Sequence, residues 1–506
     1  MKIQRERSAL RWTSRSGYYF LPRSRYRAEV ILNYHQLDRR PGSSKQVDPL
    51  CRNFNSNLPF AGPVAEMLWR AGYRRAKTTA RDAARHIHEI ERAERRMAYQ
   101  VPYSGISNRL GDEEIKAVTQ ALGQDTLAMG PSGAEFEERF AEALGARHVK
   151  ATSSCTTALF LAAQVLELRP GDEVITTPQT FWVTTWPLQA RGCVVKFADI
   201  DPDSLNIDPA TIEPLITERT KSIWVVHYGG QAVDMDPVME IARRHGLTVV
   251  EDCAHVAGGT YKGRSLGTIG DIGCFSFHSL KNMTTGEGGA FVTGDDRYAE
   301  MARALGTIHN YGEMREREDP AIGPYRQPAY YKDAHVLRSY THDYVDGRYL
   351  VGNNYRMSEL SAALGIVQLG RLDRLNDRRR EIAHRIDAGV SGVPGIGIQH
   401  EKPYARHVYH LYTLFYQPET VGAPKDDFIK HLQEEEGIEI VIRYFPIHLL
   451  PEFRALGHRY GECPVAEKTY FEHQIQLPIY DHLTDAQIEH MIGAVRRGVA
   501  ALSGTA

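Results

Sequence analysis

Hydrophobic positions from about residue 105 onward predict alternating helices and strands. In the segment FEERFAEALGA, Phe136, Phe140 and Leu144 recur on one face of a helix, and Gly145 follows as its stop. Four short runs rich in β-branched residues come next, and their continuous apolar character is typical of strands buried on both faces of a sheet. They occupy residues 172–177, 193–200, 222–230 and 247–255.

The segment between the last two strands indicates how they are connected. DPVMEIARRHG is predicted to be a helix with Asp236 as its N-cap, Pro237 in its first turn and Gly246 as its stop. A strand, a helix and a second strand in this order form a crossover between parallel strands. We therefore expect an α/β domain in which helices cover a mostly parallel sheet, with ligands at the carboxyl ends of the strands.

Composition and pattern divide the chain into three predicted parts. Residues 1–96 are expected to be a basic, poorly ordered extension, residues 97–375 a large α/β domain, and residues 376–506 a smaller C-terminal α/β domain. The charged segment RLDRLNDRRREIAHRI is predicted to be a helix that connects the two domains. A long loop at residues 308–350 holds seven tyrosines, which favours a lid over a substrate site; a surface decoration or a dimer contact is the alternative.

Charge and cysteine content restrict the function classes. Of 506 residues, 42% are apolar, and no run approaches the roughly 18 apolar residues that span a bilayer, so we expect no membrane segment. Residues 1–99 hold 21 Lys and Arg against 9 Asp and Glu, whereas the rest holds 40 against 54. This basic start could be a transit peptide or bind nucleic acid, but an extension without a role in the chemistry is preferred. Six scattered cysteines indicate neither disulfides nor a metal site, and fit a reducing cytoplasm.

Three separated segments carry candidate chemistry. Small polar residues in SSCTTAL, at 153–159, precede a predicted helix and could bind a phosphate, although a serine that simply caps the helix is an alternative. Glu251 and Asp252 lie at the end of a predicted strand. A carboxylate at this place is either a surface group or the partner of a buried cation. Lys281 stands between an aromatic run and the glycine-rich GEGG. An amine in a partly dry pocket loses its proton easily and can attack a carbonyl to form a Schiff base.

An anion site, a strand-end carboxylate and a reactive lysine are together what pyridoxal phosphate requires. From about Val101 to its end, roughly four-fifths of its length, the chain resembles the StrS/DegT type of sugar aminotransferase. The resemblance rests on separated blocks: TSSCTTAL (152–159), TTPQTFWVTT (176–185), YGGQAVDMDPVMEIARRHGLTVVEDCAHVAGG (228–259), FSFHSLKNMTTGEGG (275–289), GNNYRMSELSAALG (352–365), and CPVAEKTY with the later LPIY (463–480).

The resemblance implies a fold-type-I enzyme, with a three-layer α/β/α cofactor-binding domain and a smaller C-terminal domain. It implies that Lys281 forms the Schiff base with the cofactor and shuttles protons, and that Asp252 pairs with the ring nitrogen. The other implied cofactor contacts are Cys155, Thr156, Trp182, His255, Ser276 and, across a homodimer, Asn354; His278 and Arg356 are the implied contacts of the substrate carboxylate.

One departure from the family pattern concerns the phosphate site. The family usually has glycine at the position of Cys155, so the thiol could crowd the phosphate or be tolerated there. The implied reaction is amino transfer from glutamate or glutamine to a keto-sugar, commonly nucleotide-linked, or to a keto-cyclitol. A sugar dehydratase of the same fold is an alternative, but such relatives replace the lysine with histidine. A regulator that binds DNA through its basic arm is the third interpretation.

Overall fold

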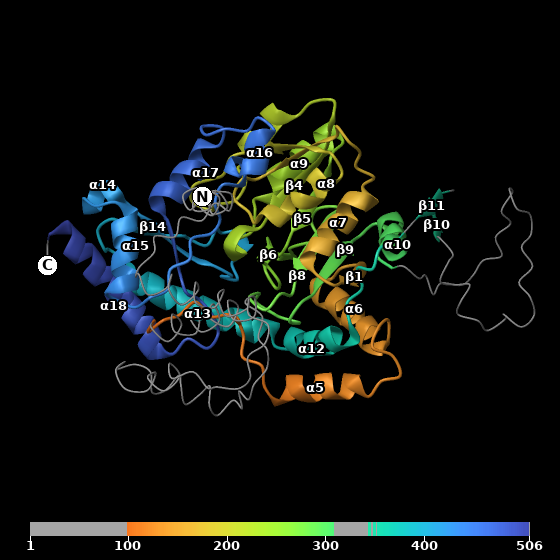
Figure 1. Cartoon of the computed structure of the whole chain (residues 1–506), viewed down its shortest axis with the longest axis horizontal. Helices are drawn as coiled ribbons and strands as arrows, with labels where there is room; N and C mark the ends of the chain where they lie inside the picture. Colours follow the sequence, from red (N-terminus) through yellow and green to blue (C-terminus); the bar gives the residue numbers. More distant parts are fainter. Residues whose placement is uncertain (1–98, 308–342, 346–347, 351, 505–506) are drawn as a thin grey trace, which may run out of the picture. The chain divides into compact units, whose positions relative to one another are not determined.

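The computed structural model describes residues 99–307, 343–345, 348–350 and 352–504 (Figure 1). The predictions for the basic extension and for the tyrosine-rich lid lie outside these residues, apart from the backbone of two short paired strands, β10 (Asp343–Val345) and β11 (Arg348–Leu350). Within the described ranges, no helix combines the length and the apolar character needed to cross a membrane.

A seven-stranded sheet forms the centre of the fold, in the order β1-β9-β8-β5-β4-β2-β3. The pairs from β8 to β3 are parallel, and β9 runs antiparallel to both of its neighbours, so the mostly parallel sheet predicted from the apolar runs is confirmed. The strands are β1 (His148–Thr152), β2 (Glu173–Thr176), β3 (Val194–Phe197), β4 (Thr220–Val226), β5 (Thr248–Asp252), β8 (Ile272–Ser276) and β9 (Gly289–Thr293).

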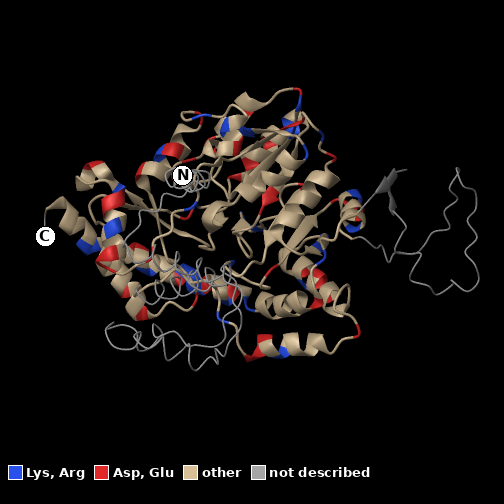
Figure 2. Cartoon of the chain, in the orientation of Figure 1, with Lys and Arg blue, Asp and Glu red and all other residues tan. Residues whose placement is uncertain are grey.

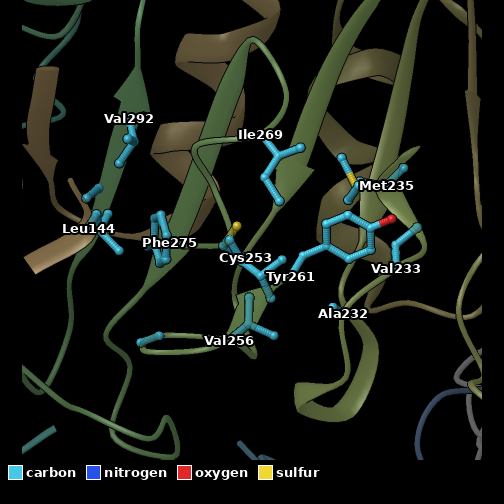
Figure 3. Close-up of a cluster of buried hydrophobic side chains, with 14 of the residues drawn as sticks. Leu144, Ala232, Val233, Met235, Cys253, Val256, Tyr261, Ile269, Phe275 and Val292 are labelled. Atoms are coloured by element: carbon cyan, nitrogen blue, oxygen red, sulfur yellow. The ribbon is translucent and has the colours of Figure 1, made fainter. Parts of the chain in front are cut away.

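Both faces of this sheet are covered, which gives three layers. Because side chains alternate along a strand, Val249 faces one buried cluster and Val250 the other. Figure 3 shows part of the first cluster, in which Phe275 and Val292 of the sheet lie near Leu144. Helices α6 (Pro131–Leu144), α9 (Met235–His245) and α12 (Glu359–Leu369) contribute to the first cluster, and α7 (Cys155–Val165), α8 (Trp186–Ala190) and α10 (Asp296–Leu305) to the second.

The predicted helix ends are mostly confirmed. Helix α6 buries Phe136, Phe140 and Leu144 and ends at Gly145 in the left-handed conformation, φ 64°. Helix α9 likewise ends at Gly246, φ 63°. The predicted start of α9 at Asp236 is wrong, because the helix already begins at Met235 after Asp234. The Asp234 carboxylate is engaged by the Tyr261 hydroxyl at 2.6 Å, so no side chain caps this helix.

The C-terminal segments form a separate buried cluster around a three-stranded antiparallel sheet, β12-β14-β15. The predicted connecting helix exists as α13 (Leu372–Val390), so the boundary expected at 375/376 falls in its first turn. Acidic and basic residues are intermixed along this helix (Figure 2), and Arg385 pairs with Asp485 and Glu489 of α18. The other elements are β12 (Ile396–Ile398), β14 (Tyr412–Tyr416), β15 (Gln474–Leu477), α14 (Pro418–Val421), α15 (Lys425–Glu434), α16 (Pro451–Ala455), α17 (Pro464–Lys468) and α18 (Asp485–Ser503).

Three further elements complete the described chain. Helix α5 (Asp112–Leu122) packs against α12, and its Glu114 accepts a hydrogen bond from Gln368 of α12 at 2.9 Å. The short strands β6 (Thr260–Tyr261) and β7 (Arg264–Ser265) form a hairpin that pairs with β13 (Ala405–Arg406). This pairing ties the loops after β5 to the C-terminal part of the chain.

Candidate active site

A cavity of about 470 Å³ lies at the carboxyl ends of the parallel strands, where an α/β sheet collects ligands. Its walls come from four places: the first turn of α7, the loop after β2, the ends of β4, β5 and β8, and two segments near the C-terminus. The lining residues are Ser154, Cys155, Thr156, Leu159, Thr180, Phe181, Val183, Thr184, Val226, Asp252, Ala254, His255, Ser276, His278, Leu280, Lys281, Glu287, His410, Arg443 and Tyr444.

Asp252 is the last residue of β5, and its side chain is 5% exposed. The Thr184 hydroxyl donates to Oδ2 at 2.8 Å, and the backbone N–H of Ala254 donates to Oδ1 at 3.0 Å. Burial raises the pKa of Asp252, while these hydrogen bonds and the charge of Lys281 oppose that rise. The result is a carboxylate that a cationic partner in the cavity would stabilise.

Lys281 follows β8 and is held by the backbone around it. The backbone N–H of Lys281 donates to the carbonyl of His278 at 2.8 Å. The carbonyl of the preceding residue, Leu280, accepts from the Ser107 hydroxyl at 2.7 Å. Burial lowers the pKa of the Lys281 amine to about 8, although the nearby acidic groups Cys155 and Asp252 oppose this effect. The amine therefore loses its proton far more easily than an ordinary lysine, as the sequence predicted.

The first turn of α7 is the place where the sequence predicts an anion site. Ser154 caps the helix by accepting from the N–H of Thr157 at 3.2 Å, and Cys155 and Thr156 follow it in the lining. The chain of β9 passes very close: a Cβ on Gly289 would lie 2.5 Å from the Cys155 nitrogen. The capping interpretation of SSCTTAL is confirmed. A capping serine leaves the other N–H groups at the helix start available, so phosphate binding there stays a prediction.

His255 sits between two rings that sequence reasoning did not associate with it. Its ring stacks on His410 with 4.3 Å between centroids, and its Nε2 lies 3.2 Å from the Tyr444 hydroxyl. Burial lowers the pKa of both histidines well below the usual value, so both rings are neutral. Both ring nitrogens of His410 are buried without a hydrogen-bond partner among the described residues.

Seven of the ten predicted site residues line this cavity. They are Cys155, Thr156, Asp252, His255, Ser276, His278 and Lys281. Trp182 is 38% exposed and packs edge-on against Trp186, while the adjacent Phe181 is in the lining. Asn354 is exposed, and Arg356 bridges to the backbone of Thr152. These last three residues are not brought to the cavity of this chain.

The lining residues that sequence reasoning missed include Thr184, His410, Arg443 and Tyr444. Thr184 had a signal, because a threonine in the loop after β2 can reach the end of a neighbouring strand. The other three are more than 120 positions from Lys281 along the chain, and no local pattern marks them.

Glu251, the neighbour of Asp252, does not line the cavity and stabilises a loop through hydrogen bonds. Its carboxylate accepts from His227 at 2.9 Å and from three backbone N–H groups of residues 267–270, at 2.7 to 2.9 Å. With Cys253, these side chains have the spacing of a metal site. The four hydrogen bonds already occupy both oxygens of Glu251, so the group serves to fix the loop that follows β7.

The comparisons with known proteins agree with this geometry. Residues 108–496 match the model of the DegT/DnrJ/EryC1/StrS aminotransferase family. The chain belongs to this family. It is 37% identical to the spore coat polysaccharide biosynthesis protein SpsC of Bacillus subtilis, over 76% of this chain and 94% of that protein.

Solved structures of aminotransferases share the fold. The aminotransferase from Psychrobacter cryohalolentis is 29% identical with a TM-score of 0.70, covering 79% of this chain and all of that one. The PLP form of Spr1654 from Streptococcus pneumoniae is 26% identical with a TM-score of 0.68, covering 80% and 100%. The protein is thus an aminotransferase of fold type I, and its cofactor is pyridoxal 5'-phosphate. An amine of lowered pKa, a buried carboxylate and a helix N-terminus facing one cavity are the donor set this cofactor needs.

Proposed function

We propose that the protein transfers an amino group from glutamate or glutamine to a keto-sugar, nucleotide-linked, or to a keto-cyclitol. The observation that carries the proposal is that Lys281, Asp252 and the start of α7 face one cavity. The relation to SpsC, named for polysaccharide biosynthesis, favours a sugar as the acceptor.

The residues of the cavity have separate roles in holding the cofactor and in moving a proton. Lys281 would hold the cofactor at its aldehyde carbon, Asp252 at its ring nitrogen, and Thr156 with Ser276 at its phosphate. The cofactor supplies the carbonyl that takes up the amino group and the ring that accepts electrons. With its pKa near 8, the Lys281 Nζ can take a proton from the substrate carbon and return it within one catalytic cycle. We assign the ring-stacking role to Phe181, since its ring lines the cavity.

The proposal also includes the assembly, the cellular location and the partners of the enzyme. We infer that it works as a homodimer in the cytoplasm, without a nucleic-acid or membrane partner. In such a dimer, the exposed Asn354 would reach the cofactor phosphate held by the partner subunit. Sedimentation of the purified protein, and loss of cofactor affinity in Asn354→Ala, test this arrangement.

The proposed reaction is tested in two halves. The purified protein should be yellow, and an amino donor should bleach this colour as the amino group is taken up. A panel of keto-sugars and keto-cyclitols should then restore the colour, with the aminated sugar detected by mass spectrometry. A dehydrated sugar as the product would instead support the dehydratase alternative. Retention of DNA that depends on residues 1–99, without amino transfer, would support the regulator.

A further inference from the structure

Arg443 places an unpaired positive charge at the cavity. Arg443 lines the cavity, and no described Asp or Glu lies within salt-bridge distance of its guanidinium. Burial is the main reason that the pKa values of Lys281 and His255 are lowered, and the positive charge of Arg443 acts in the same direction on both. All three residues line the same cavity, so a ligand bound there can contact Arg443 as well as Lys281 and His255.

The position of Arg443 is fixed by an aromatic ring under its guanidinium and by hydrogen bonds to its backbone. It lies over the ring of Tyr103, 4.7 Å from the centroid, which leaves the edge with its N–H groups available. The backbone N–H of Arg443 donates to the Gln476 side chain at 2.8 Å. Its carbonyl accepts from Gln476 at 3.0 Å, and from the side chains of Gln474 and Tyr228.

Tyr444 supplies a second donor beside it, and its direction follows from the hydrogen bonds of His255. The backbone N–H of Gly229 donates to His255 Nδ1 at 3.3 Å, so this nitrogen carries no proton. In the neutral ring Nε2 must carry it and donates to the Tyr444 oxygen at 3.2 Å. The hydroxyl hydrogen of Tyr444 is then free for another acceptor. Burial raises the pKa of Tyr444 further above neutral pH, so the phenol keeps this hydrogen.

We propose that Arg443 and Tyr444 together bind the carboxylate of the amino donor. The inference rests on the proposed function and names the donor site within it. A guanidinium edge and a phenol O–H are complementary to a planar carboxylate, and a charge-assisted pair fixes its orientation. The start of α7 is a separate anion site, which the cofactor phosphate takes. In this proposal Arg443 takes the role that the sequence predicted for Arg356, while His278, which also lines the cavity, lies 3.7 Å from Glu287.

The first experiment uses the donor half-reaction alone, which needs no sugar. The colour change of the cofactor-loaded enzyme is followed while L-glutamate is titrated into the wild type, R443Q and R443K. Loss of a charge-assisted hydrogen bond predicts a roughly 10- to 100-fold weaker apparent affinity for glutamate in R443Q, with partial recovery in R443K. Arg454→Gln is the matched control, because Arg454 is an exposed arginine outside the lining.

Y444F removes the O–H donor and keeps the ring. A roughly 3- to 10-fold weaker affinity for glutamate is expected in the donor half-reaction, and an unchanged affinity would contradict the role of Tyr444. If R443Q weakens the acceptor and leaves glutamate unchanged, the site binds an anionic group of the sugar and the proposal is overturned. If Arg356→Gln produces the effect expected of R443Q, it is overturned as well.

A binding measurement separates this inference from the proposed function. Calorimetry with glutarate, a dicarboxylate without an amino group, reports the site even if no amino donor reacts. Binding to the wild type that is lost in R443Q supports the site, while equal binding to both, or none to the wild type, contradicts it. By contrast, a wild type that no amino donor bleaches would contradict the proposed function.

Discussion

The buried amine of Lys281 should destabilise the cofactor-free protein at neutral pH. Burial lowers its pKa from 10.5 to about 8, and each pKa unit corresponds to about 1.4 kcal/mol, so the charged amine costs roughly 3 kcal/mol in the folded state. Lys281→Met keeps the length of the side chain and removes the charge. We expect the variant to be inactive yet more stable than the wild type at pH 7, by up to about 3 kcal/mol.

The pH dependence of this difference has a defined sign. Between pH 8 and 10.5 the unfolded lysine binds a proton that the folded one has lost, so wild-type stability rises with pH in this window. The advantage of Lys281→Met should therefore shrink as the pH rises from 7 toward 10.5. Above that range the two proteins should differ only through the apolar contacts of the side chain.

Urea unfolding of the cofactor-free proteins at a series of pH values measures this effect. Lys221→Met serves as the control, because Lys221 is exposed on β4, and it should change stability by no more than about 0.5 kcal/mol. A Lys281→Met variant that is no more stable than the wild type at pH 7 would refute the reasoning. An advantage that stays constant with pH would also do so, since the amine would then not be desolvated.

Three further changes test the surroundings of the site. Thr184→Val removes a hydrogen bond that lowers the pKa of Asp252, so turnover should fall by about 10-fold and the acid limb of the pH profile should move to higher pH; Thr184→Ser should retain the wild-type profile. Gly289→Ala places a Cβ 2.5 Å from the Cys155 nitrogen, and should weaken cofactor binding in a fluorescence titration; unchanged binding would show that α7 shifts freely. Glu251→Ala leaves four donors without their acceptor, and should lower the free energy of unfolding by about 3 to 5 kcal/mol in urea; a loss below 1 kcal/mol would contradict the structural role given to this residue.

The sequence by itself indicated four of the seven strands, several of the helices that cover the sheet, and the pair Asp252 and Lys281. Apolar runs such as TVVED are typical of strands buried on both faces, and the spacing of Phe136, Phe140 and Leu144 fits one side of a helix. Once the sheet is parallel, a carboxylate at the end of β5 and a lysine after β8 must lie at the same edge. Asp252 ends β5 and Lys281 follows β8, and the pairing of these two strands in the structure brings both residues to one edge of the sheet.

The tertiary structure alone decided the wall that faces the substrate. Phe181 and Trp182 are both aromatic, and only the turn after β2 determines which of them lines the cavity. Arg443 and Tyr444 lie some 160 positions after Lys281, in a segment without a recognisable motif. Their place depends on side chains of β15 that hold the backbone of Arg443, and on packing between distant parts of the chain. Such contacts depend on three-dimensional packing and leave no period in the sequence, which is why the donor site had to be found in the fold.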